Sequence, residues 1–377
     1  MNFAINAIYL EGNRTGIGRY LKNILIQWAK DHPDNKYYLY FRKDIPTDDF
    51  LQAPCFIKKV VKAPGIFKKW ILWENLFLPW ALYKDRKNID WYYSPSYTIP
   101  LIQPIKKVAV AIFDIYYTVK PEWIPLKNRF TQSWLSRRAA RKADLVICAS
   151  DFDKNDIVKY YEVPEDKVKV VYLAAELKFQ PAEKNPQNPI FFKYKIKPRY
   201  ILCLGHIINR RVQHKIIEAF GHIQREHSDV SLVLVGQNRT CPFIDIQKLV
   251  DDNDKNNSIV WIHYVDEADI MDLFQQAETF IYLTIYEGES IPLREAMASG
   301  IPTITTPMLS EVTANAAIYV KDAKNSQEIS QAMKKILTAS HEIKEKYINA
   351  GLNQTEKYTW DGCARDTYDL FKNYEIQ

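Results

Sequence analysis

Short apolar runs alternate with amphipathic stretches along most of the chain, a pattern typical of α/β proteins. Residues 3–10 predict a first strand, and the side chains of Tyr20, Ile24 and Trp28 recur at helical spacing in a predicted helix from about residue 19 to residue 30. Further strands are predicted at Tyr37 to Phe41, Phe56 to Val61, Trp91 to Tyr93, Val108 to Ile112, Leu145 to Ala149 and Val168 to Leu173. This alternation favours a mostly parallel sheet.

The alternation stops once and then restarts. Residues 175–198 are rich in proline, lysine and asparagine and have no clear period, so they are the best candidate for a linker. Beyond them the pattern predicts strands at Tyr200 to Gly205, Val230 to Gly236 and Ile259 to Ile262, and helices at about Val212 to Glu226 and Ile244 to Asp252. A chain of 377 residues also exceeds what one hydrophobic core usually serves. We therefore predict two doubly wound α/β domains, residues 1–180 and 181–357, and a tail, residues 358–377.

The stretch from residue 277 to residue 306 carries the strongest functional signal. Residues 280–285 predict a buried parallel strand, Pro292 suits the first turn of a helix, and Gly300 suits the left-handed residue that ends it. Loops at the carboxyl end of a parallel strand bind ligands in open α/β sheets, and the N–H groups of a helix start suit phosphate. The stretch therefore predicts a phosphate-binding loop between strand and helix.

Two carboxylates lie on either side of this loop, which reads Glu287-Gly288-Glu289-Ser290. Glu287 ends the strand and Glu295 lies one turn inside the helix, so a ligand resting on the helix start could offer hydroxyls to both. Each residue also has a plainer interpretation. Glu295 could be a solvated helix residue, and Glu289 could merely favour the helix dipole from the first turn.

The whole stretch resembles the EGFGLPxxEAMAxGxPV signature of retaining glycosyltransferases with the GT-B fold. These are enzymes of the glycosyltransferase family 4 (group 1) type, and the chain is similar to bacterial mannosyl- and rhamnosyltransferases of polysaccharide synthesis. Glu287 and Glu295 stand at the two glutamate positions of the signature, with seven residues between them. The chain departs from the signature at Glu289, where the family usually has Phe, and at Ser290, where it usually has Gly.

The resemblance implies two Rossmann-like domains facing a cleft, an N-terminal one for the acceptor and a C-terminal one for the nucleotide sugar. It also implies that the tail is a helix that crosses back onto the N-terminal domain. Glu287 would orient hydroxyls of the donor sugar, and Glu295 would accept hydrogen bonds from the nucleotide ribose. The amides of Gly288, Glu289, Ser290 and Ile291 would face the donor phosphates.

A second loop of the C-terminal domain, in ILCLGHIINRR, carries Gly205, His206, Arg210 and Arg211. Adjacent arginines on a loop are usually solvated. In the resembling enzymes, however, this loop reads glycine, four residues, then Arg-Lys, and the basic pair neutralises the diphosphate leaving group. Arg211 replaces the lysine, which keeps the charge and adds a fork suited to bidentate phosphate contacts.

In the N-terminal domain, Gly16-Ile17-Gly18 predicts a glycine loop between strand and helix. A lone GxG is more often a tight turn than a phosphate site, but the GIGRY string resembles the first loop of bacterial mannosyl- and rhamnosyltransferases. In those enzymes this loop faces the donor phosphates and the acceptor.

Asp114 is kept from a His-Asp pair of the resembling enzymes, whereas Phe113 replaces the histidine. Phe cannot hydrogen-bond a sugar hydroxyl. Either another group such as His206 or His263 takes over, the donor is a deoxy sugar, or activity is low.

Composition limits the partners and cofactors. The net charge of +6, from 51 basic and 45 acidic residues, suits nucleotide phosphates or a lipid headgroup but is too diffuse to indicate nucleic acid. The five cysteines form no CxxC pair and no metal-ligand cluster is evident, so we expect no metal and no cofactor beyond the nucleotide sugar as co-substrate. No apolar run is long enough to span a membrane and the N-terminus lacks signal-peptide features, so a cytoplasmic location is expected.

Two segments raise the question of a membrane surface. Residues 66–84 carry three tryptophans and lysines at both ends, which indicates either buried packing or a peripheral contact with a membrane interface. A basic group, Arg137, Arg138, Arg141 and Lys142, falls on a predicted helix, where it is either solvated or binds anionic lipid.

The predicted function is transfer of a sugar, first of all mannose from GDP-mannose, to a glycan or lipid-linked acceptor in surface polysaccharide or O-antigen synthesis. The resemblance implies retention of configuration, without a protein nucleophile or a bound metal. Alternatives are a rhamnosyl- or other hexosyltransferase that uses a dTDP- or UDP-sugar, a sugar-nucleotide epimerase of the same fold, and a non-catalytic carbohydrate-binding partner.

Overall fold

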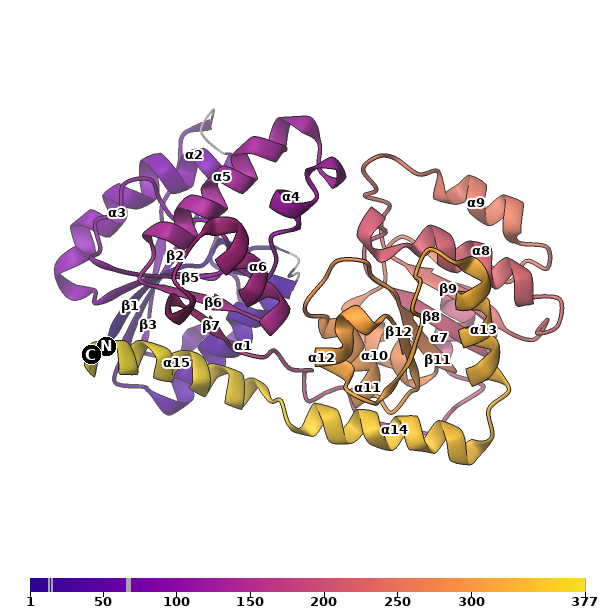
Figure 1. Ribbon diagram of the computed structural model, residues 1–377. Coiled ribbons are helices and arrows are strands. Elements are labelled where there is room, and N and C mark those ends of the chain that lie inside the picture. Colours follow the sequence, from indigo (N-terminus) through magenta and orange to yellow (C-terminus); the bar gives the residue numbers. More distant parts are fainter. Residues whose placement is uncertain (13, 15, 66–68, 377) are drawn as a thin grey trace. The chain divides into compact units, whose positions relative to one another are not determined.

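The computed structural model describes residues 1–12, 14, 16–65 and 69–376. It forms two compact units. The N-terminal unit consists of residues 1–119, 127–173 and 360–377, and the C-terminal unit of residues 120–126 and 174–359. Each unit has a parallel sheet with helices packed against it (Figure 1). This confirms the predicted fold class of two Rossmann-like α/β domains.

The sheet of the N-terminal unit has the strand order β3-β2-β1-β4-β5-β6-β7. Its strands are β1 (Asn2–Asn6), β2 (Lys36–Phe41), β3 (Phe56–Val60), β4 (Trp91–Ser94), β5 (Lys107–Ala111), β6 (Leu145–Cys148) and β7 (Val168–Val170). Phe3 of β1 pairs with Tyr37 on one side and with Trp91 on the other. The order in which successive strands are added therefore reverses between β1 and β4. In such sheets, ligands bind at the carboxyl ends of the two strands where this reversal occurs.

The helices of this unit are α1 (Gly16–Asp31), α2 (Trp70–Leu72), the π-helical η4 (Trp73–Phe77), α3 (Leu78–Asp85), α4 (Tyr116–Val119), α5 (Leu126–Lys142), α6 (Asp151–Tyr161) and α15 (Trp360–Ile376). α1 begins at Gly16, so the glycines predicted to form a loop lie in its first turn. A Cβ atom at Gly18 would collide with the carbonyl oxygen of Tyr9. The close approach of two backbones, and not only a turn, therefore requires this glycine.

The sheet of the C-terminal unit has the order β10-β9-β8-β11-β12-β13. Its strands are β8 (Tyr200–Leu204), β9 (Ser231–Val235), β10 (Ile259–Ile262), β11 (Thr279–Tyr282), β12 (Thr303–Thr305) and β13 (Ala317–Tyr319). Its helices are α7 (Pro189–Tyr194), α8 (Gln213–Ile223), α9 (Ile246–Asn253), α10 (Glu267–Gln275), α11 (Ile291–Ala298), α12 (Ser310–Thr313), α13 (Ser326–Leu337) and α14 (His341–Glu356). The direction of winding switches between β8 and β11.

The predicted linker is not free of structure. Within residues 175–198 the chain forms α7, and Ile190 and Phe191 of this helix are buried in the C-terminal unit. Asn188 starts the helix because its side chain accepts a hydrogen bond from the N–H of Ile190. Proline and asparagine in this segment therefore mark a helix start as well as a connection. A helix of six residues is too short to produce a clear periodic pattern, so the sequence did not reveal it.

The last helix returns to the N-terminal unit, as predicted. The indole Nε1 of Trp28 on α1 donates to the carbonyl oxygen of Ala364 at 2.9 Å. The ring of Phe371 packs edge-on against the rings of Phe3, Trp91 and Tyr93. An apolar face that the sheet would otherwise expose is thus covered by the end of the chain.

Truncation of Phe371 is expected to destabilise the N-terminal unit. Phe371→Ala removes a fully buried ring from this aromatic cluster and should lower the free energy of unfolding by about 3–5 kcal/mol. Urea denaturation followed by circular dichroism measures the change. Lys372→Ala, at the neighbouring exposed position, is the matched control, and equal stability of the two variants would contradict the proposed role of the helix.

Candidate active site

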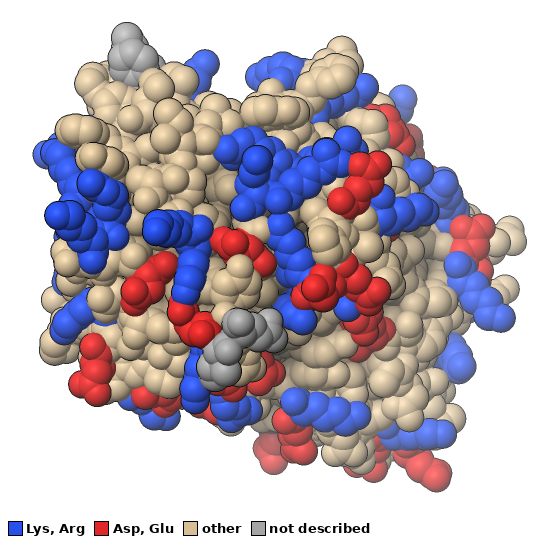
Figure 2. Space-filling model, turned by 60° about the vertical axis from the view of Figure 1, so that its left-hand side comes forward, with Lys and Arg blue, Asp and Glu red and all other residues tan. Residues whose placement is uncertain are grey.

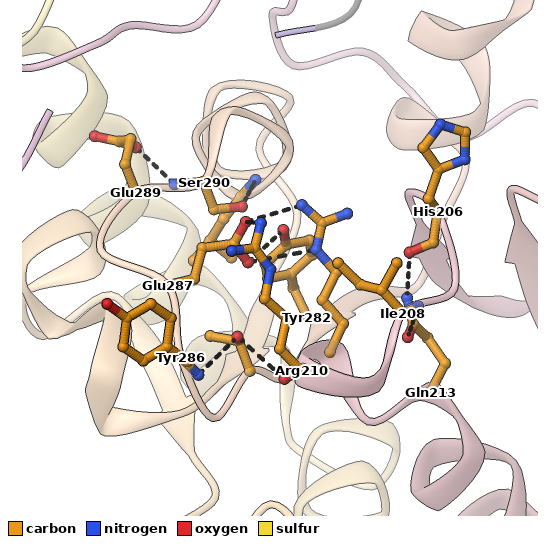
Figure 3. A network of polar contacts seen from close by, with 12 residues as sticks. His206, Ile208, Arg210, Gln213, Tyr282, Tyr286, Glu287, Glu289 and Ser290 are labelled. Atoms are coloured by element: carbon orange, nitrogen blue, oxygen red, sulfur yellow. Dashed lines mark hydrogen bonds and ion pairs between the residues drawn. The ribbon is translucent and has the colours of Figure 1, made fainter. Parts of the chain in front are cut away.

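Four side chains form a buried charged cluster at the carboxyl end of β11 (Figure 3). Glu287 is only 7% exposed. Its carboxylate accepts hydrogen bonds from Arg211 Nη2 at 2.8 Å and from Tyr282 Oη at 2.9 Å. Arg210 Nη2 lies 3.4 Å from Glu287 Oε1. Burial alone would raise the pKa of Glu287, but the charges of Arg211 and Arg210 outweigh it and hold that pKa below its ordinary value.

The arginines reach this carboxylate because two loops are tied together at the switch between β8 and β11. The carbonyl oxygen of Arg210 accepts the N–H of Ile285 at 2.8 Å and the hydroxyl of Thr284 at 3.2 Å. Gly205 adopts φ +128°, and a Cβ atom there would stand 2.7 Å from Arg211 Nη1. Gly205 therefore leaves the space through which the guanidinium group of Arg211 passes.

The loop after Glu287 leads directly into α11. Ser290 caps this helix, since its Oγ accepts the N–H of Leu293 at 3.3 Å. Pro292 lies in the first turn and Gly300 adopts φ +69°, as the sequence predicts. One expectation changes: the amide of Ser290 donates to Glu289 Oε1 at 2.8 Å. This N–H group, expected to face donor phosphates, is therefore engaged by a neighbouring carboxylate.

Other predicted donor residues surround this cluster. Ile291 and Glu295 are buried on α11, Glu295 with 1% of its surface exposed. Its expected contact with a ribose remains a prediction. His206 is half-buried, and burial together with the charges of Arg239 and Arg211 lowers its pKa, which favours a neutral imidazole at pH 7. Its carbonyl oxygen accepts the side chain of Gln213 at 3.0 Å.

The structure therefore brings together Gly205, His206, Arg210, Arg211 and the segment from Glu287 to Ile291 in the C-terminal unit. The other predicted residues belong to the N-terminal unit: Gly16, Ile17 and Gly18 at the start of α1, and Asp114 between β5 and α4. Phe113 packs edge-on against Tyr20 at 4.8 Å between ring centroids. His263 directly follows β10 and packs against Trp261; β10 is an edge strand, separated from β11 by β9 and β8.

Two buried charged side chains escaped the sequence analysis. Arg294 on α11 forms a bidentate pair with Glu289, which replaces the dipole interpretation of Glu289. Glu74 on η4 accepts hydrogen bonds from Thr98 Oγ1 at 2.9 Å and from Asn6 Nδ2 at 3.3 Å. A charged residue on an apolar helix face was the available signal for both. Among the described residues, no group of three or more His, Cys, Asp or Glu side chains is arranged to hold a metal ion.

Comparisons with known proteins show what this chain is similar to. Residues 186–354 match the family model of glycosyl transferases group 1, and residues 15–179 match that of glycosyltransferase family 4. The chain is 26% identical over 298 residues to O-antigen chain mannosyltransferase B of Escherichia coli. This alignment covers 78% of this chain and 76% of that protein. It is 27% identical over 226 residues to O-antigen chain mannosyltransferase RfbU of Salmonella typhimurium, covering 59% of this chain and 58% of that protein.

Solved structures share the fold. WaaG, a glycosyltransferase involved in lipopolysaccharide biosynthesis, has a TM-score of 0.74 at 15% identity and covers 98% of this chain and 99% of its own. HepE of Anabaena in complex with UDP-glucose has a TM-score of 0.73 at 14% identity, with 99% of each chain covered. The group 1 match lies within the C-terminal unit, and the family 4 match covers most of the N-terminal unit. The chain belongs to these glycosyltransferase families and has the GT-B fold.

Glu74 generates a prediction about pH. Burial raises its pKa to about 7, whereas the unfolded chain releases this proton near pH 4.5. Between these two pH values the native state binds a proton that the unfolded chain has released. The contribution of Glu74 to the free energy of unfolding is therefore fully present below pH 4.5 and is lost as the pH rises through 7. The loss should be about 3 kcal/mol.

Glu74→Gln should abolish most of this pH dependence, because its amide does not titrate. Urea unfolding at pH 5 and pH 8 measures the difference. Glu165→Gln, at an exposed position of the same unit, should keep the wild-type dependence. A wild-type protein that is equally stable at both values would contradict the assignment.

Proposed function

We propose that this glycosyltransferase moves a hexosyl group from a nucleotide-diphosphate sugar to a glycan or lipid-linked glycan acceptor, with retention of configuration. Mannose from GDP-mannose is the first candidate donor group, and synthesis of O-antigen or a similar surface polysaccharide is the candidate process. The names of the two O-antigen mannosyltransferases above support the sugar and the process. The observation that carries the proposal is the pair of arginines held on one buried carboxylate beside a helix start.

The charges of this cluster suit a departing diphosphate. Arg210 and Arg211 bring two positive charges to this cluster, and both approach the carboxylate of Glu287. A diphosphate that enters beside the N-terminus of α11 would meet these guanidinium groups together with the helix dipole. Fixed positive charge aimed at a leaving group usually contributes more than any other effect to such catalysis.

Glu287 has two roles in this proposal. It holds both guanidinium groups before the donor arrives, and its depressed pKa keeps it ionised, so that it accepts hydrogen bonds from donor hydroxyls. The hydroxyl of Tyr282 helps to hold Glu287 in place by donating a hydrogen bond to its Oε2. Because Glu287 also neutralises buried charge, removing it would leave two buried arginines without their carboxylate. A substitution of Arg211 is therefore a cleaner test of function than Glu287→Ala.

One observation favours a second donor class. The ring of Phe113 stands against Tyr20 where the resembling enzymes carry a histidine, and neither ring face offers a hydrogen bond to a sugar hydroxyl. A 6-deoxy sugar such as rhamnose, carried by dTDP or UDP, would not require that bond. A thermal-shift panel of GDP, UDP, dTDP and ADP sugars separates these donors, because a bound ligand stabilises the native state.

Arg211→Met should lower kcat/KM for the validated donor by about 10²–10³-fold, because it removes a positive charge near the leaving group. Arg211→Lys should retain more activity than Arg211→Met, since the charge remains and the fork is lost. Arg225→Met, at an exposed position of the same unit, is the control. Unchanged transfer by Arg211→Met in a steady-state assay would overturn the proposed mechanism.

The acceptor proposal includes a peripheral contact with an anionic membrane. Among the described residues, no helix is long and apolar enough to cross a bilayer. The side chains of residues 69–84 differ in exposure. Trp73 and Leu78 are buried, whereas Trp80 is 61% exposed and Tyr83 is also exposed. Trp80 borders a groove of about 510 Å³ whose wall includes Lys59, Lys62 and Lys84. The segment thus contributes some side chains to the core and leaves others exposed for the proposed membrane contact.

A second pair of exposed aromatic side chains lies on α5. Phe130 and Trp134, four residues apart on α5, are 88% and 57% exposed, and α5 contains six basic residues and no acidic one. Leu101 connects η4 with α5. Its N–H donates to the side chain of Asn75 in η4, and its carbonyl oxygen accepts a hydrogen bond from Arg138 of α5. Aromatic side chains beside lysine and arginine suit the interface of an anionic bilayer.

Part of the basic group predicted on α5 has a structural role, although Arg137, Arg141 and Lys142 stay exposed. Arg137 donates to the carbonyl oxygen of Tyr160 at 3.0 Å, and Arg141 donates to that of Tyr161 at 2.8 Å. These carbonyls belong to the last turn of α6, whose partial negative charge the arginines neutralise. Lysine and arginine side chains are interspersed with acidic ones on the face seen in Figure 2, as the modest net charge requires.

Trp80→Ser combined with Phe130→Ser should reduce sedimentation with vesicles of phosphatidylglycerol and phosphatidylcholine by at least tenfold at low salt. Both substitutions remove exposed aromatic anchors and leave the core intact. Phe192→Ser combined with Phe243→Ser, at exposed aromatic positions of the C-terminal unit, is the matched control. Absence of vesicle binding by the wild-type protein, or equal loss in the control, would rule out this surface.

A further inference from the structure

Partly exposed tyrosines lie at the carboxyl ends of β4 and β5 in the N-terminal unit. Tyr97 lies in the segment after β4, and Asp114 and Tyr116 follow β5, Tyr116 at the start of α4. All three side chains are half-buried. β4 is one of the two strands between which the strand order reverses, and β5 is its neighbour. This is the edge of the sheet at which open α/β domains bind ligands.

One buried ring supports both of these tyrosine rings. The ring centroid of Tyr117 lies 5.2 Å from that of Tyr97 and 5.6 Å from that of Tyr116. Tyr117 is itself fixed, because its hydroxyl donates to Ser136 Oγ of α5 at 2.8 Å. The two partly exposed rings therefore rest on an anchored side chain, which reduces the entropy that a bound ligand would cost.

The segment that carries Tyr97 is held by a compact set of hydrogen bonds. The hydroxyl of Ser94 and the N–H of Thr98 both donate to the carbonyl oxygen of Ser96, at 3.0 Å and 2.8 Å. Thr98 Oγ1 also donates to Glu74 Oε1 at 2.9 Å. These bonds fix the backbone on both sides of Tyr97, so the position of its ring is set before any ligand arrives.

Polar groups lie close to the ring of Tyr97. Burial raises the pKa of its phenol to about 12, with smaller contributions from Tyr116 and from the charge of Asp114, so the hydroxyl is a hydrogen-bond donor at pH 7. The side chain of Gln132 on α5 also approaches this phenol. Its amide oxygen is buried and has no hydrogen-bond partner among the described residues. A buried acceptor without a donor is costly, and a hydroxyl group of a ligand would supply the missing hydrogen bond.

The charge of this edge indicates which part of an acceptor binds here. Residues 91–105 contain no charged residue, and residues 108–119 contain only Asp114. The segment after β8 in the C-terminal unit, in contrast, carries Arg210 and Arg211. Arginine and lysine are the usual partners of phosphate, and these two segments of the N-terminal unit contain neither. A neutral sugar suits them better, because its C–H groups pack on the electron-rich face of an aromatic ring and its hydroxyls donate to a carboxylate.

We propose that Tyr97, Asp114 and Tyr116 bind the accepting end of the acceptor, and that this end is a neutral saccharide and not the diphosphate of a lipid carrier. The inference rests on the proposed function, because it names the acceptor class of that reaction. The two tyrosines offer ring faces, and Asp114 accepts a hydrogen bond from a sugar hydroxyl. Tyr117 and Glu74 are positioning residues, since they hold the tyrosine rings and the turn that carries Tyr97.

Saturation-transfer difference NMR without the donor tests this assignment. The probes are neutral oligosaccharides of mannose, rhamnose, glucose and galactose, and geranyl diphosphate represents the diphosphate of a lipid carrier. At least one oligosaccharide is expected to bind the wild type, and geranyl diphosphate should not displace it. Tyr97→Ala and Tyr116→Ala should each weaken that binding about tenfold. Tyr83→Ala, at an exposed position on α3 of the same unit, is the matched control and should bind as the wild type does.

Conservative variants separate a lost contact from a lost fold. Tyr97→Phe keeps the ring and should bind the oligosaccharide within about threefold of the wild type. Asp114→Asn keeps the shape and should weaken binding about fivefold, because a charged acceptor forms the stronger hydrogen bond. Each variant should bind the nucleotide diphosphate found in the donor panel with wild-type affinity, since the proposed donor loop belongs to the C-terminal unit.

Three results would overturn the inference: a wild type that binds no neutral oligosaccharide, wild-type oligosaccharide binding in both alanine variants, or binding of geranyl diphosphate that Tyr97→Ala abolishes. Each of these results leaves donor binding untouched. A wild type that binds no nucleotide diphosphate would instead contradict the proposed function.

Discussion

The buried carboxylate of Glu287 organises the candidate site. Two guanidinium groups from the segment after β8 and the phenol of Tyr282 at the end of β11 converge on it. Without this carboxylate, two like charges would stand close together in a largely dry environment, which is costly. With it, both arginines are preorganised. The same interaction that makes the loops compatible with burial thus leaves them suited to a diphosphate.

The helix that follows carries its own charge pair on the opposite side. Glu287 faces the arginines of the β8 loop, whereas Glu289 faces Arg294 inside α11. Two carboxylates of one short loop are thereby kept apart, each with its own cation. This separation explains how the chain tolerates a glutamate where its relatives carry an apolar residue, since the charge never approaches the proposed diphosphate site uncompensated.

The N-terminal unit is built on aromatic contacts and close backbone approaches. Gly18 admits the carbonyl oxygen of Tyr9, and Phe371 of the last helix fills a cluster around Phe3 and Trp91. Its exposed aromatic side chains gather on α3 and α5, beside lysines and arginines. The unit thus has a packed face that holds the end of the chain and exposed aromatic and basic side chains that form the proposed membrane contact.

The sequence by itself determined the two parallel sheets, the loop from Glu287 to Ser290, the helix after Pro292 and the paired arginines, because periodicity and turn residues act locally. It did not reveal that Arg294 binds Glu289, that α7 lies in the linker or that α5 turns its arginines onto α6. Those facts depend on which distant side chain fills a buried position. Only the tertiary structure decided them, because a charge finds its partner through space and not through spacing along the chain.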